Sequence, residues 1–221
     1  MEAMHAMSKY DAAVFDMDGL LVDSESVWAK ALRTTFAEYG FEMSYETSIS
    51  FVGTATYEEE RCIREMYHDD PRAMEAFRAH EKLAISMLRN EGLPVKEGAR
   101  ELLEELSKLG IPCAVASGSP RGLVEAELGN AGLLEFFRFI VTSEGGIPSK
   151  PAPDIFLVAS ERLGTDPVRT VVFEDSPAGV EAAVAAGMPV IVVPDLVAPT
   201  AEQEALCVAR CDTLREAIAY L

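Results

Sequence analysis

Short apolar runs alternate with amphipathic segments in the second half of the chain. The apolar runs, at 111–116, 139–142, 170–173 and 189–193, have the length and composition of buried strands. Segments with apolar residues three or four positions apart predict helices over 97–109, 120–131, 152–163 and 177–186, and a capping pattern predicts a last helix over 213–221. This alternation predicts an α/β fold, in which a Rossmann-like parallel sheet lies between two layers of helices.

The first half of the chain has a different pattern. An apolar strand over 12–15 is followed by about 70 residues without a convincing strand, where helical spacing predicts helices over 27–39, 57–67 and 71–89. We therefore expect residues 24–93 to form an all-helical domain. It would be inserted into an α/β domain made of residues 8–23 and 94–221.

Polar residues follow several of the predicted strands at the point where each strand ends. They are Asp16 and Asp18, Ser117-Gly118-Ser119, Lys150 after a loop, and Glu174 with Asp175. In an open parallel sheet, sites form at the carboxyl ends of the strands. The positions of these residues therefore predict one site at one edge of the sheet.

The four acidic residues at this edge each have a simpler interpretation. Asp18-Gly19 resembles an ordinary turn pair, and Glu174 with Asp175 resembles the acidic start of a helix. Together, however, four carboxylates repel one another unless a divalent cation lies between them. Because Mg²⁺ prefers oxygen ligands, we expect it as the cofactor, held by Asp16, Asp18, Glu174 and Asp175.

Ser117-Gly118-Ser119 and Lys150 have the composition of an anion site. Hydroxyl and amide groups ahead of a helix can bind an anion, and Lys150 would add a positive charge. Taken alone, the first segment could be an ordinary loop and the lysine a solvated one. Beside four carboxylates, they indicate a site for a phosphate group.

The overall charge limits the choice of partner. The 221 residues carry a net charge of −18, from 37 acidic and 19 basic residues, so nucleic acid and anionic membranes are disfavoured as partners. No apolar run approaches the roughly 20 residues of a membrane span. The first seven residues do not resemble a signal peptide. The four cysteines never form a Cys-x-x-Cys pair, so we expect reduced thiols. Without a span or a signal peptide we expect a cytoplasmic protein, and the chain is long enough to stand as a monomer.

Four segments occur in the order and spacing of a known set of motifs. The segments are Asp16-Met17-Asp18-Gly19-Leu20-Leu21-Val22-Asp23-Ser24, Ser117-Gly118-Ser119, Ser149-Lys150-Pro151-Ala152-Pro153-Asp154 and Glu174-Asp175-Ser176-Pro177-Ala178-Gly179. Over about residues 10–195, the chain resembles the haloacid dehalogenase superfamily. The resemblance is to the branch with a helical cap after the first motif, which includes β-phosphoglucomutase, sugar-phosphate phosphatases and phosphoglycolate phosphatases.

The resemblance implies a role for each motif residue. Asp16 would be the nucleophile that forms an aspartyl-phosphate, and Asp18 the general acid and base. Mg²⁺ would be held by Asp16, by Asp175 and by the backbone carbonyl of Asp18. Glu174 would either bind the ion directly or lie next to a residue that does. Ser117, Gly118 and Lys150 would bind the phosphoryl oxygens. The function implied is a Mg²⁺-dependent phosphatase acting on a small phosphorylated metabolite, such as a sugar phosphate.

A mutase and a non-catalytic binding protein remain open beside the phosphatase, whereas dehalogenation is disfavoured. Asp18 stands where dehalogenases of the superfamily carry an aromatic residue, which favours phosphoryl transfer over dehalogenation. A sugar-phosphate mutase of the β-phosphoglucomutase type would have an arginine after the cap glycine, here Gly53, and a lysine after Ser119, where Pro120 and Arg121 stand. A non-catalytic phosphate-binding protein is the third possibility. We expect Glu25, Trp28, Gly53 and Arg121 as candidate substrate residues.

Overall fold

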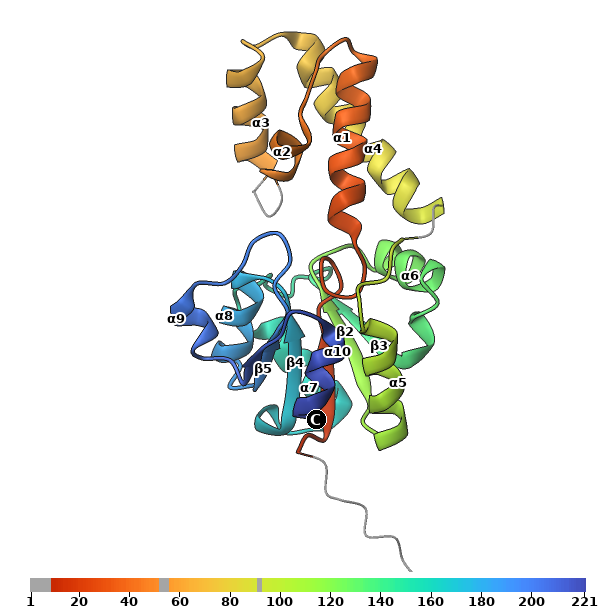
Figure 1. Cartoon of the computed structure of the whole chain (residues 1–221), viewed down its shortest axis with the longest axis vertical. Coiled ribbons are helices and arrows are strands. Elements are labelled where there is room, and N and C mark those ends of the chain that lie inside the picture. Colours follow the sequence, from red (N-terminus) through yellow and green to blue (C-terminus); the bar gives the residue numbers. More distant parts are fainter. Residues whose placement is uncertain (1–8, 52–55, 91–92) are drawn as a thin grey trace, which may run out of the picture.

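The computed structural model describes residues 9–51, 56–90 and 93–221, which form two units (Figure 1). A six-stranded sheet and its helices make up one unit, and helices α1–α4 make up the other. The strands are β1 (Ala12–Phe15), β2 (Cys113–Ser117), β3 (Phe137–Thr142), β4 (Thr170–Glu174), β5 (Val190–Val192) and β6 (Ala209–Arg210). They lie in the order β3-β2-β1-β4-β5-β6, and every pairing between neighbours is parallel.

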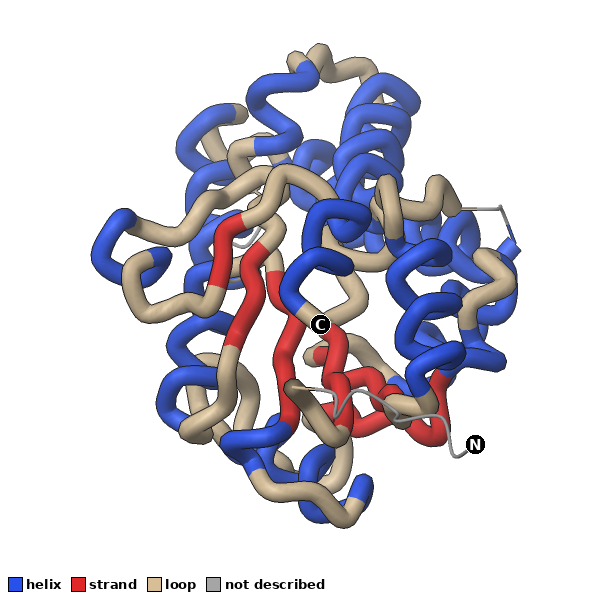
Figure 2. The backbone as a smooth tube through the Cα atoms, turned by 60° about the horizontal axis from the view of Figure 1, so that its bottom comes forward, coloured by secondary structure: helices blue, strands red, loops and turns tan. Residues whose placement is uncertain are grey.

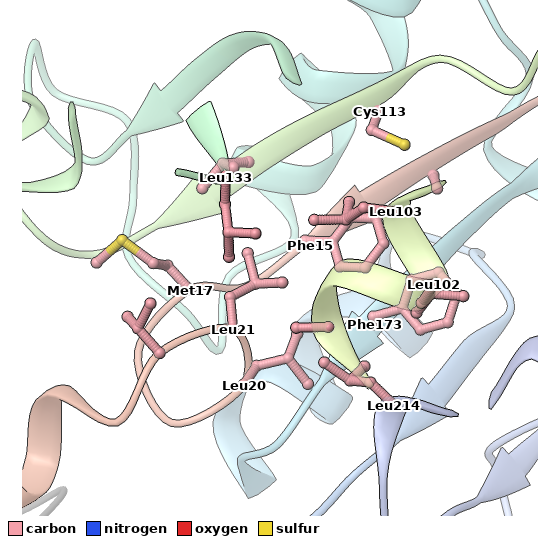
Figure 3. Packing of buried hydrophobic residues seen from close by; sticks show 14 of the residues in the cluster. Phe15, Met17, Leu20, Leu21, Leu102, Leu103, Cys113, Leu133, Phe173 and Leu214 are labelled. Atoms are coloured by element: carbon pink, nitrogen blue, oxygen red, sulfur yellow. The ribbon is translucent and has the colours of Figure 1, made fainter. Parts of the chain in front are cut away.

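The central strands are buried on both faces, and their side chains alternate between two hydrophobic clusters. Ala13 and Phe15 of β1 belong to the first cluster, whereas Val14 belongs to the second. Figure 3 shows the first cluster, in which the rings of Phe15 and Phe173 stack with centroids 4.5 Å apart. A strand that contacts a core on each face needs apolar residues at every position, which is why these strands are continuous apolar runs.

The helices cover the two faces of the sheet separately. Helices α5 (Ala99–Leu109), α6 (Arg121–Asn130) and α10 (Leu214–Ala217) contribute to the first cluster. Helices α7 (Asp154–Leu163) and α8 (Pro177–Ala185) contribute to the second. Figure 2 shows the strands between these helices. The prediction of a three-layer Rossmann-like fold is therefore confirmed.

The second unit consists of four helices that follow β1. They are α1 (Ser24–Glu38), α2 (Tyr45–Ile49), α3 (Thr56–Met66) and α4 (Pro71–Asn90). This helical unit has a hydrophobic cluster of its own, which includes Leu32, Phe36, Ile63 and Phe77. The two segments that join it to the sheet unit lie side by side, because the amide of Asp23 donates to the carbonyl of Pro94 at 3.0 Å.

The structure adds several short elements that the apolar pattern did not predict. They are α2, α9 (Ala201–Glu204), β6, and the 3₁₀ turns Leu134–Phe136, Pro167–Arg169 and Ile218–Tyr220. Elements this short span too few residues to show a period. The last helix was predicted to reach Leu221, but α10 ends at Ala217 and continues as a 3₁₀ turn.

Prolines explain why one strand and one helix begin later in the chain than predicted. Strand β2 begins at Cys113 instead of residue 111, since Pro112 has no amide hydrogen to pair with a neighbouring strand. Helix α7 begins at Asp154 instead of residue 152, because a residue before a proline, here Ala152, disfavours helical backbone.

The strand order fixes where a site can form. The chain passes from β1 to β2 and β3 on one side, then returns to β4 on the other side of β1. This reversal leaves the carboxyl ends of β1 and β4 next to each other at the edge where open α/β sheets bind ligands. Figure 1 shows the helical unit beyond this edge. Within the described residues, no helix combines the length and hydrophobicity that crossing a membrane requires.

Candidate active site

Asp16 is the first residue after β1 and is fixed by the neighbouring strand. Its amide donates to the carbonyl of Phe173 in β4 at 3.0 Å, and the residue is 8% exposed. The chain then turns sharply at Gly19, whose φ is 80°. A Cβ atom at Gly19 would lie 2.5 Å from Oδ2 of Asp175, so only glycine gives this turn and leaves room for Asp175.

The Asp18 carboxylate accepts hydrogen bonds from three hydroxyl groups. Ser24 donates to Oδ1 at 2.7 Å, and Ser117 and Ser119 donate to Oδ2 at 3.2 Å and 2.9 Å. Ser117 is fully buried, and its Oγ also accepts the amide hydrogen of Ser119 at 3.0 Å. Ser117 therefore holds Asp18 and the loop in this structure, and the direct phosphate contact expected from the sequence stays a prediction.

Lys150 lies between two acidic residues from different strands. Its ammonium contacts Oδ1 of Asp16 and donates to Oε1 of Glu174 at 2.7 Å. The second oxygen of Glu174 accepts hydrogen bonds from the amides of Asp175 and Ser176, at 2.9 Å and 3.0 Å, and from the Ser176 hydroxyl at 3.0 Å. Glu174 is fully buried, and these bonds pay for its desolvation.

Burial and charge shift the acid–base equilibria of this cluster. Burial raises the pKa of Asp16 to about 7, where Lys150 opposes the rise and Glu174 and Asp18 add to it. Burial, Glu174 and Asp16 also raise the pKa of Asp175. Burial alone would raise the pKa of Glu174, but Lys150 and the Ser176 hydrogen bonds bring it below its usual value. Burial would lower the pKa of Lys150, but Asp16 and Glu174 raise it further, so the ammonium stays charged.

The donor set fits a hard divalent cation. One carboxylate oxygen from each of Asp16, Glu174 and Asp175 lies within 4.8 Å of the others. Oxygen-only ligands of this kind suit Mg²⁺, and a cation would offset the repulsion that raises the pKa of Asp16 and Asp175. The carboxylate of Asp18 is engaged by three hydroxyls and is not part of this group.

A cavity of about 870 Å³ connects these residues with the helical unit. Its floor includes Asp16, Asp18, Gly118, Lys150 and Asp175. Of the residues suggested as substrate contacts, Glu25 and Trp28 line the cavity, whereas Gly53 lies outside the described residues.

Arg121 is placed differently from the expectation. Its guanidinium donates to the carbonyl of Ile140 at 2.6 Å and lies 3.6 Å from Glu125. Arg121 is not among the described residues that line the cavity. The start of α6 directs the side chain to the neighbouring strand, so the structure does not bring Arg121 together with the other suggested substrate residues.

Several residues that line the cavity were not expected from the sequence. Glu59 of α3 and His80 of α4 line the cavity on the helical side. Asp195, in the loop after β5, lines it near the floor and is paired with Lys96 at 2.6 Å. Glu59 and His80 belong to the helical unit, so only its packing against the sheet unit brings them to the site. For Asp195, the position just after a strand was a usable signal.

Glu127 is a further acidic residue that the sequence did not single out. It lies on α6, is fully buried, and neither of its carboxyl oxygens has a hydrogen-bond partner among the described residues. Burial and the charge of Asp18 raise its pKa to about 8. The Glu127 side chain is therefore largely protonated at neutral pH.

Comparison with known sequences identifies the family. The profile of the haloacid dehalogenase-like hydrolase family matches residues 13–193. The chain belongs to this family. The fructose-1-phosphate phosphatase of Escherichia coli is 33% identical over 182 residues, which cover 81% of this chain and 94% of the relative. Hexitol phosphatase B of Escherichia coli is 32% identical over 197 residues, covering 87% and 86%.

A solved structure from the same family shares the fold. The crystal structure of a haloacid dehalogenase family hydrolase from Deinococcus radiodurans, with bound phosphate and sodium, is 29% identical with a TM-score of 0.79. The match covers 95% of this chain and 93% of the other. Together, the family match and the relatives confirm the prediction that this chain is a phosphatase enzyme.

Proposed function

We propose that this family member is a Mg²⁺-dependent phosphatase that hydrolyses small phosphorylated metabolites, sugar phosphates in particular, through an aspartyl-phosphate. The observation that carries the proposal is the position of Asp16. Its carboxylate lies beside the Lys150 ammonium and within a three-carboxylate group, and it lines a cavity large enough for a small ester. The sugar-phosphate and hexitol phosphatases among the relatives support this substrate class.

In the proposed reaction, Asp16 and Asp18 act together in two steps. An oxygen of Asp16 attacks the phosphorus, the bond to the ester oxygen breaks, and Asp18 gives that oxygen a proton. Water then attacks the phosphorus of the aspartyl-phosphate while Asp18 takes its proton, and the bond to Asp16 breaks to release phosphate. The three hydroxyls that hold Asp18 fix its carboxylate for both proton transfers.

The other residues of the site bind and neutralise the phosphoryl group. Lys150 and the Gly118 amide would bind its oxygens, since both residues line the cavity. Asp16, Asp175 and the Asp18 backbone carbonyl would hold Mg²⁺, with Glu174 behind them because its oxygens already accept several hydrogen bonds. Bound Mg²⁺ supplies positive charge that reduces the repulsion between the Asp16 carboxylate and the phosphoryl oxygens.

We also propose that the helical unit, residues 24–93, is a cap domain on a core of residues 8–23 and 94–221. Its separate hydrophobic cluster and the adjacent crossings near Asp23 and Pro94 support this division. Helices α1, α3 and α4 contribute to the cavity, so closure of the cap would exclude water while the leaving group departs.

The placement of Arg121 argues against the mutase alternative. A mutase holds a bisphosphate in two orientations and needs cations for both phosphates. The Arg121 side chain, the candidate for the second cation, is bonded to the Ile140 carbonyl instead. Stoichiometric phosphate release from a sugar phosphate would exclude a mutase. The intact set Asp16, Asp18, Lys150 and Asp175 argues against a non-catalytic binding protein.

The test is a phosphate-release assay over a panel of phosphorylated metabolites, with MgCl₂ or EDTA. We expect release with Mg²⁺ only, and none from Asp16→Asn, whose folding is checked by circular dichroism. Asp18→Asn should slow both steps with a sugar phosphate. With p-nitrophenyl phosphate, whose leaving group needs no proton, only the second step should be slow, and intact-protein mass spectrometry should then detect a phosphoryl adduct on Asp16. Full activity of Asp16→Asn, or no release from any ester, would contradict the proposal.

A further inference from the structure

The side of the cavity formed by the helical unit has its own chemistry. If the phosphoryl group binds at the floor, as the proposed function requires, then the leaving group lies against this side. We define the helical wall as Glu25 and Trp28 of α1, Glu59 of α3 and His80 of α4, all of which line the cavity. Trp28 packs edge-on against His80, with ring centroids 5.9 Å apart, so it offers an apolar surface between polar groups.

The free polar atoms of the helical wall are mainly hydrogen-bond acceptors. Glu25 and Glu59 are half-buried, and neither carboxylate has a hydrogen-bond or ion-pair partner among the described residues. Nδ1 of His80 contacts the backbone carbonyl of Phe77, which can only accept, so Nδ1 carries the hydrogen. Burial lowers the pKa of His80, and the neutral ring then leaves Nε2 as an acceptor. Such a wall is complementary to hydroxyl groups.

The negative charge of the cavity also favours an uncharged leaving group. Burial and the charges of Asp18, Asp195, Asp23 and Glu59 raise the pKa of Glu25 to about 7, so this part of the cavity resists a further negative charge. A second anionic group on the substrate would meet the same resistance.

Few cations are available to balance that second group. Among the described residues that line the cavity, the permanent cations are Lys150 and Arg78. Lys150 lies at the floor between Asp16 and Glu174, and Arg78 is exposed. Residues 52–55, outside the described part, are Val-Gly-Thr-Ala and carry no charge. The cavity therefore offers positive charge to one phosphate and little to another anion.

We propose that the helical wall selects esters of uncharged, polyhydroxylated alcohols and rejects leaving groups that carry a carboxylate or a second phosphate, with Glu25 and Glu59 as the specificity-determining residues. The wall accepts hydroxyl hydrogens from such an alcohol, and Trp28 contacts its carbon chain. A carboxylate or phosphate on the leaving group brings no hydrogen to donate and adds repulsion. The proposed substrates are therefore phosphate monoesters whose leaving group is uncharged.

The test compares two esters that differ in one group. Sorbitol 6-phosphate has a CH₂OH group where 6-phosphogluconate has a carboxylate, so the pair isolates the charge. We expect wild-type kcat/KM to favour sorbitol 6-phosphate by about tenfold or more, and this ratio to shrink as NaCl is raised. Glu25→Gln and Glu59→Gln should each raise kcat/KM for 6-phosphogluconate about threefold or more.

The control is Glu75→Gln, which removes an exposed carboxylate from α4 outside the cavity lining and should leave the ratio unchanged. A gain of activity on the anionic ester separates specificity from damage, since a misfolded variant loses activity on both esters. Equal wild-type rates on the two esters, or an unchanged ratio in both glutamine variants, would overturn the proposal.

Calorimetric binding of the same two esters to Asp16→Asn with Mg²⁺ separates this inference from the proposed function. A preference for sorbitol 6-phosphate in binding, without hydrolysis by the wild type, would contradict the phosphatase proposal and support charge selection. Equal affinity for both esters would contradict charge selection, whatever the wild type hydrolyses.

Discussion

The Cα atom of Gly179 lies directly against the carboxylate of Glu174, where a Cβ atom would come within 1.8 Å of the Glu174 Cδ atom. Glu174 ends β4, and Gly179 lies in the first turn of α8. The hydroxyl of Ser176 accepts the Gly179 amide hydrogen at 3.1 Å and donates to Glu174, so the start of α8 and the acidic residue are fixed together. The buried Lys150–Glu174 ion pair therefore requires a glycine at position 179, where a Cβ atom would displace Glu174.

We expect Gly179→Ala to push Glu174 away from Lys150 and Ser176. Phosphatase activity, measured as kcat/KM on a sugar phosphate, should fall at least tenfold, and the free energy of unfolding should fall by about 1–3 kcal/mol. Gly129→Ala is the control, because a Cβ atom at this position in α6 meets nothing within 4 Å. It should stabilise the protein by about 0.5–1 kcal/mol without loss of activity. Wild-type activity in Gly179→Ala would show that Glu174 can move freely.

Mg²⁺ should stabilise the wild type, because it relieves the repulsion within the three-carboxylate group. With Mg²⁺ at about 100 times its Kd, we expect a rise in Tm of roughly 5–10 °C. Asp175→Asn removes one ligand and one source of repulsion. Its Tm in EDTA should equal or exceed that of the wild type, and its response to MgCl₂ should largely disappear. Differential scanning fluorimetry measures both, with Glu75→Gln as a control that keeps the response. A full response in Asp175→Asn would exclude Asp175 as a ligand.

Ser24 should assist catalysis through Asp18 alone. Its hydroxyl donates to Asp18 at 2.7 Å, and the residue is buried and does not line the cavity. Ser24→Ala removes one charge-assisted hydrogen bond, so kcat should fall about tenfold, which corresponds to about 1.4 kcal/mol, with KM nearly unchanged. Ser26→Ala, two residues away, removes only a bond to the Asp23 carbonyl and should leave kcat intact. Equal effects of the two substitutions would contradict a role through Asp18.

Glu127 should make the protein less stable as pH rises. Its pKa is about 8 in the folded protein and about 4.3 in an unfolded chain. Between these values the folded state keeps a proton that the unfolded state releases, so this contribution to the free energy of unfolding falls with pH. The slope reaches about 1.4 kcal/mol per pH unit at most.

Glu127→Gln removes this titration. Relative to the wild type, the variant should therefore gain stability steadily from pH 5 to about pH 8, as measured by urea denaturation at a series of pH values. Glu125→Gln, an exposed change on the same helix, should keep a constant difference from the wild type. A constant difference for Glu127→Gln as well would show that the carboxyl group is paired or hydrated.

The residues of the cavity floor could be predicted because they obey a local rule. Asp16, Glu174 and Asp175 each follow directly from the end of an apolar strand, and the carboxyl ends of parallel strands share one edge of the sheet. The hydrogen bond from Ser117 to Asp18 could not be predicted in this way. Ser117 is the last residue of β2, and only atomic packing decides that its hydroxyl is directed to Asp18.

The helical wall shows the limit of the sequence more clearly. Glu25 and Trp28 stand near the first motif and could be suggested, but Glu59 and His80 lie in ordinary amphipathic helices, where an acidic residue or a histidine is usually solvated. Their position in the cavity depends on how α3 and α4 pack on α1. In the same way, the sequence suggested Arg121 as a substrate contact, whereas α6 turns its guanidinium to the Ile140 carbonyl.

The amino-acid pattern alone was enough to predict the three-layer fold, the inserted helices and the acidic residues at the sheet edge. These depend on hydrophobic periodicity and on which residues follow a strand, and both are properties of neighbouring residues. The tertiary structure decided which hydroxyls hold Asp18, where Arg121 points, that Glu127 is buried, and that Glu25, Glu59 and His80 share one wall. These depend on contacts between residues far apart in the chain, whose distances are set by the packing of whole elements.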